Sequence, residues 1–373
     1  MKPYIINFIQ VLGHFFGIVF YDNIKTKKLF IFHTYQIGGA EIVHLDILSA
    51  LNYKPTIIFL HGTNEFGLID EYQSKANKII VINSKRIIRH FQIGVLRGII
   101  SKSDIDLIFG IADPDFYNLI SRIVKKIKII DILHSYISVD YAPEYILEKL
   151  SKRIVIDGFT QDKLKEKYIK IGFYNEISKI LLINNSVNLP LFNNQLDFSL
   201  PLRFLYVGRD TYEKRLNIII DLAQKIKKIY PEIIFTFLGP DINKFKDIPS
   251  NCIFVKVTKD RKIIESYYKK NHFILITSIR EGFPLVLMEG MSYGLIPICT
   301  SVGGIPYIVK NDYSGILLNK IKDTEIVEEI FIKIKSFYNN RKKLMEISNN
   351  SRIEAYISFD KVKFNTAYRN ILN

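Results

Sequence analysis

Two glutamates in the second half of the chain, Glu281 and Glu289, have the spacing E-x7-E around a turn sequence. The run 280–292 reads REGFPLVLMEGMS and follows an apolar segment typical of a strand. Pro284 suits the first position of a helix, because its missing N–H needs no partner there. Carboxylates accept hydrogen bonds from neighbouring hydroxyl groups. The two glutamates are therefore candidates to hold the hydroxyl groups of a ligand beside a helix start.

The start of this helix is itself a predicted anion site. The N–H groups of Phe283, Leu285 and Val286 are expected to point out of the helix end, where the helix dipole favours negative charge. A ligand with both phosphates and hydroxyl groups fits these features together. A nucleotide sugar has a diphosphate, a ribose and a hexose, so it is the expected ligand.

Basic residues follow another apolar segment, at 203–207. Arg209 and Lys214 are expected just past the carboxyl end of a strand, which is the edge where open α/β sheets bind ligands. A cation that binds a departing diphosphate more strongly in the transition state lowers the barrier. Arg215 is expected to add a further cation near the phosphates. The plainer alternative is that these residues are solvated surface side chains.

His134 ends a long apolar run, again at the carboxyl end of an expected strand. From the residues alone, it is a histidine that caps a helix or lies at the edge of the core; contact with a sugar or acceptor is the alternative, which only the family resemblance described below implies. His33, His61 and His134 all fall at strand ends, but their spacing does not indicate a metal site. Asp104 and Asp106 open their strand at the opposite edge, so no metal ligands are expected.

Four segments resemble, in order and over nearly the whole chain, the retaining GT-B glycosyltransferases of glycosyltransferase family four. They are 38–41 with Gly38 and Gly39, 206–214 with Gly208, the E-x7-E run 281–289 and the Gly-Gly loop 302–306. The E-x7-E run is the most specific of these, and the Gly38–Gly39 pair alone is a weak signal. The chain departs from the family at Arg215, where glycine is usual, and at Tyr307, where glutamate is frequent.

The resemblance implies a donor site in the C-terminal domain and an acceptor site in the N-terminal domain. It implies that Glu289 holds the ribose and Glu281 the hexose, and that Arg209 and Lys214 stabilise the diphosphate, which takes the acceptor proton. His134 would orient the sugar or the acceptor. Further donor contacts are implied at Gly38, Gly39, Gly208, Gly282, Phe283, Pro284 and Leu285. No metal is implied, and no cofactor besides the nucleotide-sugar substrate.

Short apolar runs alternate with helical patterns, which predicts two doubly wound, Rossmann-like α/β domains facing across a cleft. Strands are expected at 28–33, 56–60, 78–82, 105–109, 127–133, 153–156, 203–207, 233–238, 252–257, 272–277, 296–300 and 315–318. Helices are expected at 41–51, 160–171, 216–228, 261–269, 284–293, 324–338, 341–358 and 360–372. The Asn-, Leu- and Pro-rich stretch 184–201 predicts a linker. The domains would span 1–190 and 191–358, and the helix in 359–373 could return to the first domain.

Composition sets limits on the class of protein. The 373 residues are 48% hydrophobic and 24% charged, which excludes a disordered chain. The net charge of +15 favours anionic partners, but no basic run occurs, so a nucleic-acid-binding protein is the less favoured alternative. Cys252 and Cys299 lie in apolar runs, which predicts buried, reduced thiols and a cytoplasmic protein.

Residues 4–20 form an apolar segment that is too short and too polar to cross a membrane. Asn7, Gln10 and His14 share one face of the helix predicted there. One hypothesis packs this helix on the domain, and the other places it in an anionic membrane interface. The cations nearby in sequence or further on are Lys25, Lys27, Lys28, Lys85, Arg86 and Arg89.

These expectations together describe a metal-independent, retaining glycosyltransferase. It would move a sugar from a UDP- or GDP-linked donor to a glycan or lipid-linked acceptor in bacterial surface polysaccharide synthesis. It would work in the cytoplasm, including the inner face of the plasma membrane. The alternative on the same fold is a sugar-nucleotide epimerase, which requires acid/base carboxylates in both domains.

Overall fold

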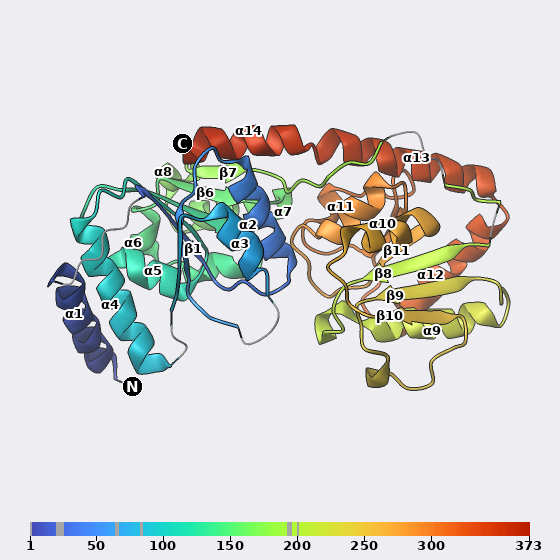
Figure 1. The fold of residues 1–373 in the computed structure, drawn as a ribbon. Helices are drawn as coiled ribbons and strands as arrows, with labels where there is room; N and C mark the ends of the chain where they lie inside the picture. The colour runs from blue at the N-terminus through green and yellow to red at the C-terminus, as the bar shows by residue number, and fades with distance from the viewer. Residues whose placement is uncertain (1, 20–25, 64–66, 83–84, 192–195, 200) are drawn as a thin grey trace. The chain divides into compact units, whose positions relative to one another are not determined.

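The computed structural model describes residues 2–19, 26–63, 67–82, 85–191, 196–199 and 201–373. The chain divides into two compact units, Met1–Ile183 with Val362–Asn373, and Asn184–Lys361 (Figure 1). From the sequence, the domain ends are expected at residues 190 and 358. Phe20 and Lys25, which belong to the membrane hypothesis, lie outside the described residues.

The N-terminal unit is built on a parallel sheet with the strand order β3-β2-β1-β4-β5-β6-β7. The strands are β1 (Lys28–Phe32), β2 (Thr56–Phe59), β3 (Lys78–Val81), β4 (Leu107–Ile111), β5 (Lys128–Leu133), β6 (Lys152–Val155) and β7 (Ile180–Leu182). The central strands are buried along nearly their whole length, as runs of Ile, Leu and Phe on both faces predict for a parallel sheet covered by helices. The helices of this unit are α1 (Pro3–Val19), α2 (Gly39–Ala50), α3 (Ile69–Lys75), α4 (Arg86–Lys102), α5 (Pro114–Ser121), α6 (Glu144–Leu147), α7 (Gly158–Lys170), α8 (Tyr174–Ile177) and α14 (Lys361–Leu372).

The C-terminal unit repeats this plan with the strand order β10-β9-β8-β11-β12-β13, again parallel. The strands are β8 (Arg203–Val207), β9 (Ile234–Leu238), β10 (Cys252–Val255), β11 (Phe273–Ile276), β12 (Ile296–Thr300) and β13 (Ile316–Leu318). The helices are α9 (Leu216–Lys227), α10 (Arg261–Lys270), α11 (Leu285–Ser292), α12 (Asp323–Tyr338) and α13 (Arg341–Ser358). Stacked rings of Phe204, Phe235 and Phe273 link three neighbouring strands in the core.

Each sheet has a point at which the chain reverses the direction in which it adds strands. This point lies between β1 and β4 in the N-terminal unit and between β8 and β11 in the C-terminal unit. Loops at the carboxyl ends of such neighbouring strands separate from each other and leave room for a ligand. The loops after these four strands are therefore where a site is expected.

Helix α1 does not pack on α4 through its large apolar side chains. It contacts α4 through the opposite face. Gln10, Gly13 and Gly17 are the buried residues of α1, whereas its large apolar side chains point outward. Figure 1 shows the two helices side by side at the edge of the N-terminal unit. Among the described helices, none has both the length and the apolar character needed to cross a membrane.

Three expectations about secondary structure were wrong. Strand β7 was missed, because three residues are too few for a periodic signal. Strand β4 begins at Leu107 rather than at residue 105, since Asp106 and Leu107 first bond to Lys27. Pro284 is the N-cap of α11 and not its first residue, because its ψ of 118° is extended.

Candidate donor-side and acceptor-side sites

Three loops at the carboxyl edge of the C-terminal sheet are tied together by hydrogen bonds. The N–H of Ile279, after β11, donates to the carbonyl of Glu213, after β8, at 2.8 Å. The N–H of Gly304, after β12, donates to the carbonyl of Gly282 at 3.2 Å. The loops that carry Lys214, Glu281 and the Gly-Gly sequence therefore form one connected structure at the predicted position.

Lys214 and Glu281 meet in this structure. Nζ of Lys214 donates to Oε1 of Glu281 at 2.6 Å, and the hydroxyl of Ser278 donates to the same oxygen at 2.5 Å. The two charged side chains are 24% and 11% exposed. Within the described part of the chain, no hydrogen bond is made to Oε2 of Glu281, so this oxygen is available to accept one from a hydroxyl group.

Gly303 allows the Glu281 loop to come this close. Its φ is +54°, a left-handed conformation that side chains rarely adopt, and a Cβ there would lie 1.7 Å from the carbonyl oxygen of Glu281. Any other residue would push the loops apart. Tyr307, where the resembling family has glutamate, lies in the following short 3₁₀ turn and is 55% exposed.

Arg215, which was expected to add a further cation near the phosphates, is instead held by contacts within the protein. Its guanidinium turns toward the protein, where Nε donates to the carbonyl of Thr277 at 2.7 Å and Nη1 lies 3.2 Å from Oδ1 of Asp323. Its φ of 49° is left-handed, which explains why glycine suits this position elsewhere. Arg215 therefore anchors the loop that presents Lys214.

Arg209 follows the carboxyl end of β8 and is exposed. Among the described residues, none forms a hydrogen bond or ion pair with its guanidinium. Gly208 precedes it with a φ of +154°, and a Cβ there would meet the hydroxyl of Tyr206 at 2.8 Å. In the part of the chain that the structure describes, the Arg209 guanidinium thus has no acidic partner, whereas Lys214 in the same loop is paired with Glu281.

The first turn of α11 lies directly after the Glu281 loop. Pro284 accepts the hydrogen bonds of Leu287 and Met288, so Leu285 and Val286 are the first helical residues, whose N–H groups have no acceptor within the helix. Phe283 is buried and anchors the turn. The helix thus begins one residue later than expected, and two of the three N–H groups predicted for the anion site, those of Leu285 and Val286, lie in its first turn.

Glu289 lies on one side of α11 and accepts hydrogen bonds from two residues of α10. Oε1 accepts from Nη1 of Arg261 at 2.7 Å, and Oε2 accepts from the hydroxyl of Tyr268 at 2.7 Å. Burial, with the Glu289 carboxylate beside it, raises the pKa of Tyr268. Each carboxylate oxygen retains a second lone pair, so the two partners orient the group without using its full capacity.

His134, in the N-terminal unit, is hydrogen-bonded to a histidine that the sequence did not single out. Nε2 of His134 lies 2.8 Å from Nε2 of His44, whose ring stacks on Phe32. Burial lowers the pKa of His134 to about 4, and burial with His134 beside it lowers the pKa of His44 well below its ordinary value. Both rings are therefore neutral near pH 7, and one must donate to the other.

The neighbouring tyrosine decides which histidine donates. The hydroxyl of Tyr72 donates to the carbonyl of Glu41 at 3.1 Å, and Nδ1 of His44 lies 3.5 Å from the same hydroxyl. Since the tyrosine proton is used in the shorter bond, we assign the proton of His44 to Nδ1. His134 then donates from Nε2, which leaves its Nδ1 as an acceptor for a hydroxyl group.

The loop after β1 carries Gly38, the N-cap of α2, and Gly39, its first residue. A Cβ at Gly38 would lie 2.4 Å from Oε2 of Glu41, so this carboxylate covers the start of its own helix. His33 in the same loop pairs with Asp113 from the loop after β4, with Nδ1 2.8 Å from Oδ2. This pair joins the two strands between which the sheet reverses direction.

His33, His61 and Asp113 form a group that the sequence spacing did not reveal. Their possible ligand atoms lie within 4.8 Å of one another. Both oxygens of Asp113 are in use, Oδ2 by His33 and Oδ1 by the N–H of Asp115 at the start of α5. The guanidinium of Arg89 also lies 3.2 Å from Nδ1 of His61. The group is thus a hydrogen-bond network with the cation of Arg89 beside it.

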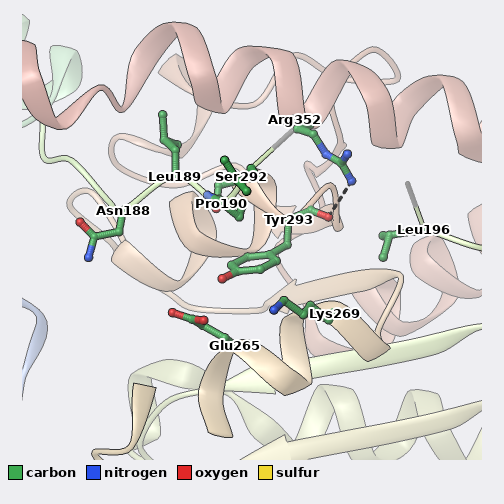
Figure 2. Close-up of a pocket in the computed structure, with 10 residues that line it drawn as sticks. Asn188, Leu189, Pro190, Leu196, Glu265, Lys269, Ser292, Tyr293 and Arg352 are labelled. Atoms are coloured by element: carbon green, nitrogen blue, oxygen red, sulfur yellow. Dashed lines mark hydrogen bonds between the residues drawn. The ribbon is translucent and has the colours of Figure 1, made fainter. Parts of the chain in front are cut away.

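A pocket of about 650 Å³ lies at the other end of α11, beside its C-cap Tyr293. Figure 2 shows Glu265, Lys269 and Tyr293 on its wall, and the hydrogen bond from Arg352 to the carbonyl of Tyr293. None of the predicted site residues lines it. Ligands of doubly wound sheets bind at the carboxyl edge, so this pocket is not assigned to the donor.

Residues 192–354 match the model of the family described as glycosyl transferases group 1. This part of the chain is similar to that family. The matched residues include Arg209, Lys214, Glu281 and Glu289, whereas Gly38, Gly39 and His134 lie outside the match.

Several glycosyltransferases are similar to this chain in sequence. An uncharacterized glycosyltransferase of Methanocaldococcus jannaschii is 27% identical over 53% of this chain, which spans 54% of that protein. One of Haemophilus influenzae is 23% identical over 88% of this chain and 95% of its own length. The amylovoran biosynthesis glycosyltransferase of Erwinia amylovora is 26% identical over 40% of each chain.

The crystal structure of Anabaena HepE in complex with UDP-glucose is similar in fold. The TM-score is 0.73 at 15% identity, over 92% of this chain and 99% of that chain. This likeness confirms the predicted fold class, GT-B with two Rossmann-like α/β domains.

The sequence did not reveal the residues that form hydrogen bonds to the predicted site residues. They are Ser278 beside Glu281, Arg261 and Tyr268 beside Glu289, and His44 beside His134. Each lies on a different element from its partner or in an ordinary polar sequence. Such contacts arise from the packing of the elements, so no local sequence pattern predicts them.

Proposed function

We propose that this protein is a retaining glycosyltransferase that transfers a sugar from a nucleotide-sugar donor without a metal ion. The observation that carries the proposal is the meeting of Lys214 and Glu281 from loops after β8 and β11, directly before the N-terminus of α11. Cation, carboxylate and helix start occur together where doubly wound sheets bind ligands.

The diphosphate would bind at the start of α11. The N–H groups of Leu285 and Val286 and the guanidinium of Arg209 would bind its oxygens, and Lys214 would turn to it from Glu281. As the bond from the sugar C1 to the diphosphate oxygen breaks, negative charge grows on that oxygen. Groups that already point toward it stabilise the transition state more than the ground state.

The carboxylates would hold hydroxyl groups. Glu281 would accept from the hexose through Oε2, which has no other partner among the described residues. Glu289 would accept from the ribose, with Arg261 and Tyr268 keeping its plane fixed. Gly208, Gly282, Phe283 and Pro284 would shape the backbone around the donor.

The acceptor oxygen would attack C1 on the face that the diphosphate leaves, and its proton would pass to the departing phosphate oxygen. No protein base is required for this balance. His134 would accept a hydrogen bond from a sugar or acceptor hydroxyl through Nδ1, and Gly38 and Gly39 would approach the donor phosphates. We further propose a glycan or lipid-linked acceptor in polysaccharide synthesis, which is supported by the relative named for amylovoran biosynthesis.

The test is a panel of UDP-, GDP-, ADP- and TDP-sugars scored by thermal shift, followed by product analysis. A donor at 100 times its Kd should stabilise the chain by about 2.7 kcal/mol. NMR of the product should show the anomeric configuration of the donor. A panel in which no nucleotide sugar binds would contradict the proposal, and an inverted product would contradict the retaining mechanism.

A further inference from the structure

Helix α1 presents a continuous apolar surface to the outside. Tyr4, Phe8, Leu12, Phe15 and Val19 are each between 48% and 70% exposed. Their spacing of three and four residues places them on one stripe, which we call the outer face of α1. A stripe of this many large apolar side chains is unusual on a surface that meets only water.

The inner face of α1 fixes this orientation. A Cβ on Gly94 of α4 would lie 2.1 Å from the carbonyl oxygen of Gln10, and one on Gly13 would lie 2.2 Å from that of Phe91. The side chain of Gln10 is buried and accepts from Nη1 of Arg97 at 2.8 Å. The glycines and the polar side chain thus hold the helix backbone to backbone against α4. Rotating the outer face inward would bring bulky side chains against the backbone of α4.

Cations outnumber acidic residues around α1. The helix itself has no charged residue from Pro3 to Val19, and Asp22 is the one acidic residue in the first 40 positions of the sequence. The exposed Lys2 precedes α1, and Lys85 and Arg86 begin the neighbouring α4, which runs in the same direction. Arg122 donates to Asn7 on α1. An apolar stripe flanked by cations complements an anionic lipid surface, where tails and headgroups offer both partners.

We propose that the outer face of α1 docks the protein on an anionic membrane surface, with the helix lying in the interface. A second copy of the chain fits less well, because two copies meeting through this stripe would bring the same cations, Lys2, Lys85 and Arg86, toward each other instead of complementary charges. The proposal is independent of the proposed transferase activity, since it rests on α1 and α4 alone.

The chain has no tryptophan, so Phe15→Trp creates a single fluorescent reporter on the outer face. Vesicles of phosphatidylglycerol and phosphatidylcholine in equal parts should shift its emission to the blue, and high salt should reverse the shift. Tyr174→Trp on α8, at a position 64% exposed, is the matched control and should not shift. Equal shifts in both variants, or none in Phe15→Trp, would overturn the proposal.

Sedimentation with the same vesicles gives a second measurement on the full chain. The double variant Phe8→Ser/Phe15→Ser should bind about tenfold less well or worse. The control Ile169→Ser/Ile332→Ser replaces two comparably exposed apolar residues elsewhere and should bind as the wild type does. Both changes are at exposed positions, and a melting curve verifies folding. Concentration-dependent self-association that Phe8→Ser/Phe15→Ser abolishes, without vesicle binding by the wild type, would assign the face to a second copy instead.

Discussion

The ammonium group of Lys214 lies 2.6 Å from Oε1 of Glu281, so a cation and a carboxylate that we assign to different parts of one substrate neutralise each other before it binds. They come from loops after β8 and β11, the neighbouring strands at which the C-terminal sheet reverses direction. A diphosphate would compete with Glu281 for Lys214, and Ser278 would still hold the carboxylate. The ion pair thus keeps both groups in place at a site that must otherwise hold separated charges.

Replacing Lys214 by alanine should reduce kcat by about 10²- to 10³-fold, which is the effect of removing one preorganised donor from a developing charge. The melting temperature should fall only slightly, because Glu281 keeps Ser278 and a partly exposed pair contributes little to stability. Glu281→Ala also loses the bond from Ser278, but it should likewise reduce kcat far more than the melting temperature. The measurements are steady-state kinetics with the donor identified in the panel, and thermal unfolding.

The matched control for this prediction is Lys333→Ala on α12, which breaks a 2.8 Å ion pair with Asp312. It should leave kcat unchanged. A comparable loss of kcat in both variants, or a loss of kcat in Lys214→Ala that follows its loss of melting temperature, would argue against a direct role of Lys214.

Arg215 offers a test of loop anchoring by two substitutions at one position. Both Arg215→Gly and Arg215→Ala lose the bonds to Thr277 and Asp323, but only alanine keeps the unfavourable left-handed backbone. The left-handed conformation is less favourable for a non-glycine residue by roughly 1–2 kcal/mol. We therefore expect Arg215→Ala to unfold at the lower temperature, and Arg215→Gly to retain more activity. The reverse order in melting temperature would show that the left-handed backbone is not conserved in the variants.

The sequence predicts the local structure around Glu281 and the start of α11 well, and it predicts side-chain contacts that depend on packing less well. Glu281 and the helix start before Leu285 follow from the E-x7-E run. The function of Arg215 could not be predicted, because a cation next to Lys214 has the same local sequence whether it points to a phosphate or to Thr277 and Asp323. The same holds for His134, whose partner His44 lies on another element.

The alternating apolar runs predict most strands of both sheets, since buried parallel strands are apolar on both faces. The orientation of α1 could not be derived from its pattern. Amphipathic reasoning assumes that the apolar face points inward, whereas the glycines of α1 and α4 make backbone contact the stronger constraint. A buried ion pair between Asp131 and Arg153, on β5 and β6, was equally invisible, because each residue interrupts an apolar run.

Activity should survive treatment with EDTA. Arg209, Lys214 and the start of α11 can neutralise the diphosphate, and the His33–His61–Asp113 group is held together by hydrogen bonds with the cation of Arg89 beside it. The measurement is the transfer rate before and after chelation, with metal analysis of the purified protein. Loss of activity on chelation, with recovery on adding Mn²⁺ or Mg²⁺, would overturn metal independence. His33→Ala would then show whether this group holds the ion.

The His44–His134 pair should make the fold sensitive to acid. The pKa of His134 is about 4 in the folded chain against an ordinary value of 6.5. Between these two pH values the histidine is protonated in the unfolded chain but neutral in the folded chain. The stabilising effect of the neutral ring is complete above pH 6.5 and is lost as the pH falls toward 4, by up to about 3 kcal/mol. His134→Gln does not titrate, and its amide can still donate to Nε2 of His44. Its melting temperature should therefore fall less than that of the wild type between about pH 7 and about pH 4.5.

His14→Gln on α1, which is remote from the pair, is the control and should follow the wild type. Parallel curves for wild type and His134→Gln would mean that the pair does not stay neutral. A flatter curve together with a lower kcat at pH 7 would support both the buried pair and the use of Nδ1 as an acceptor for a substrate hydroxyl.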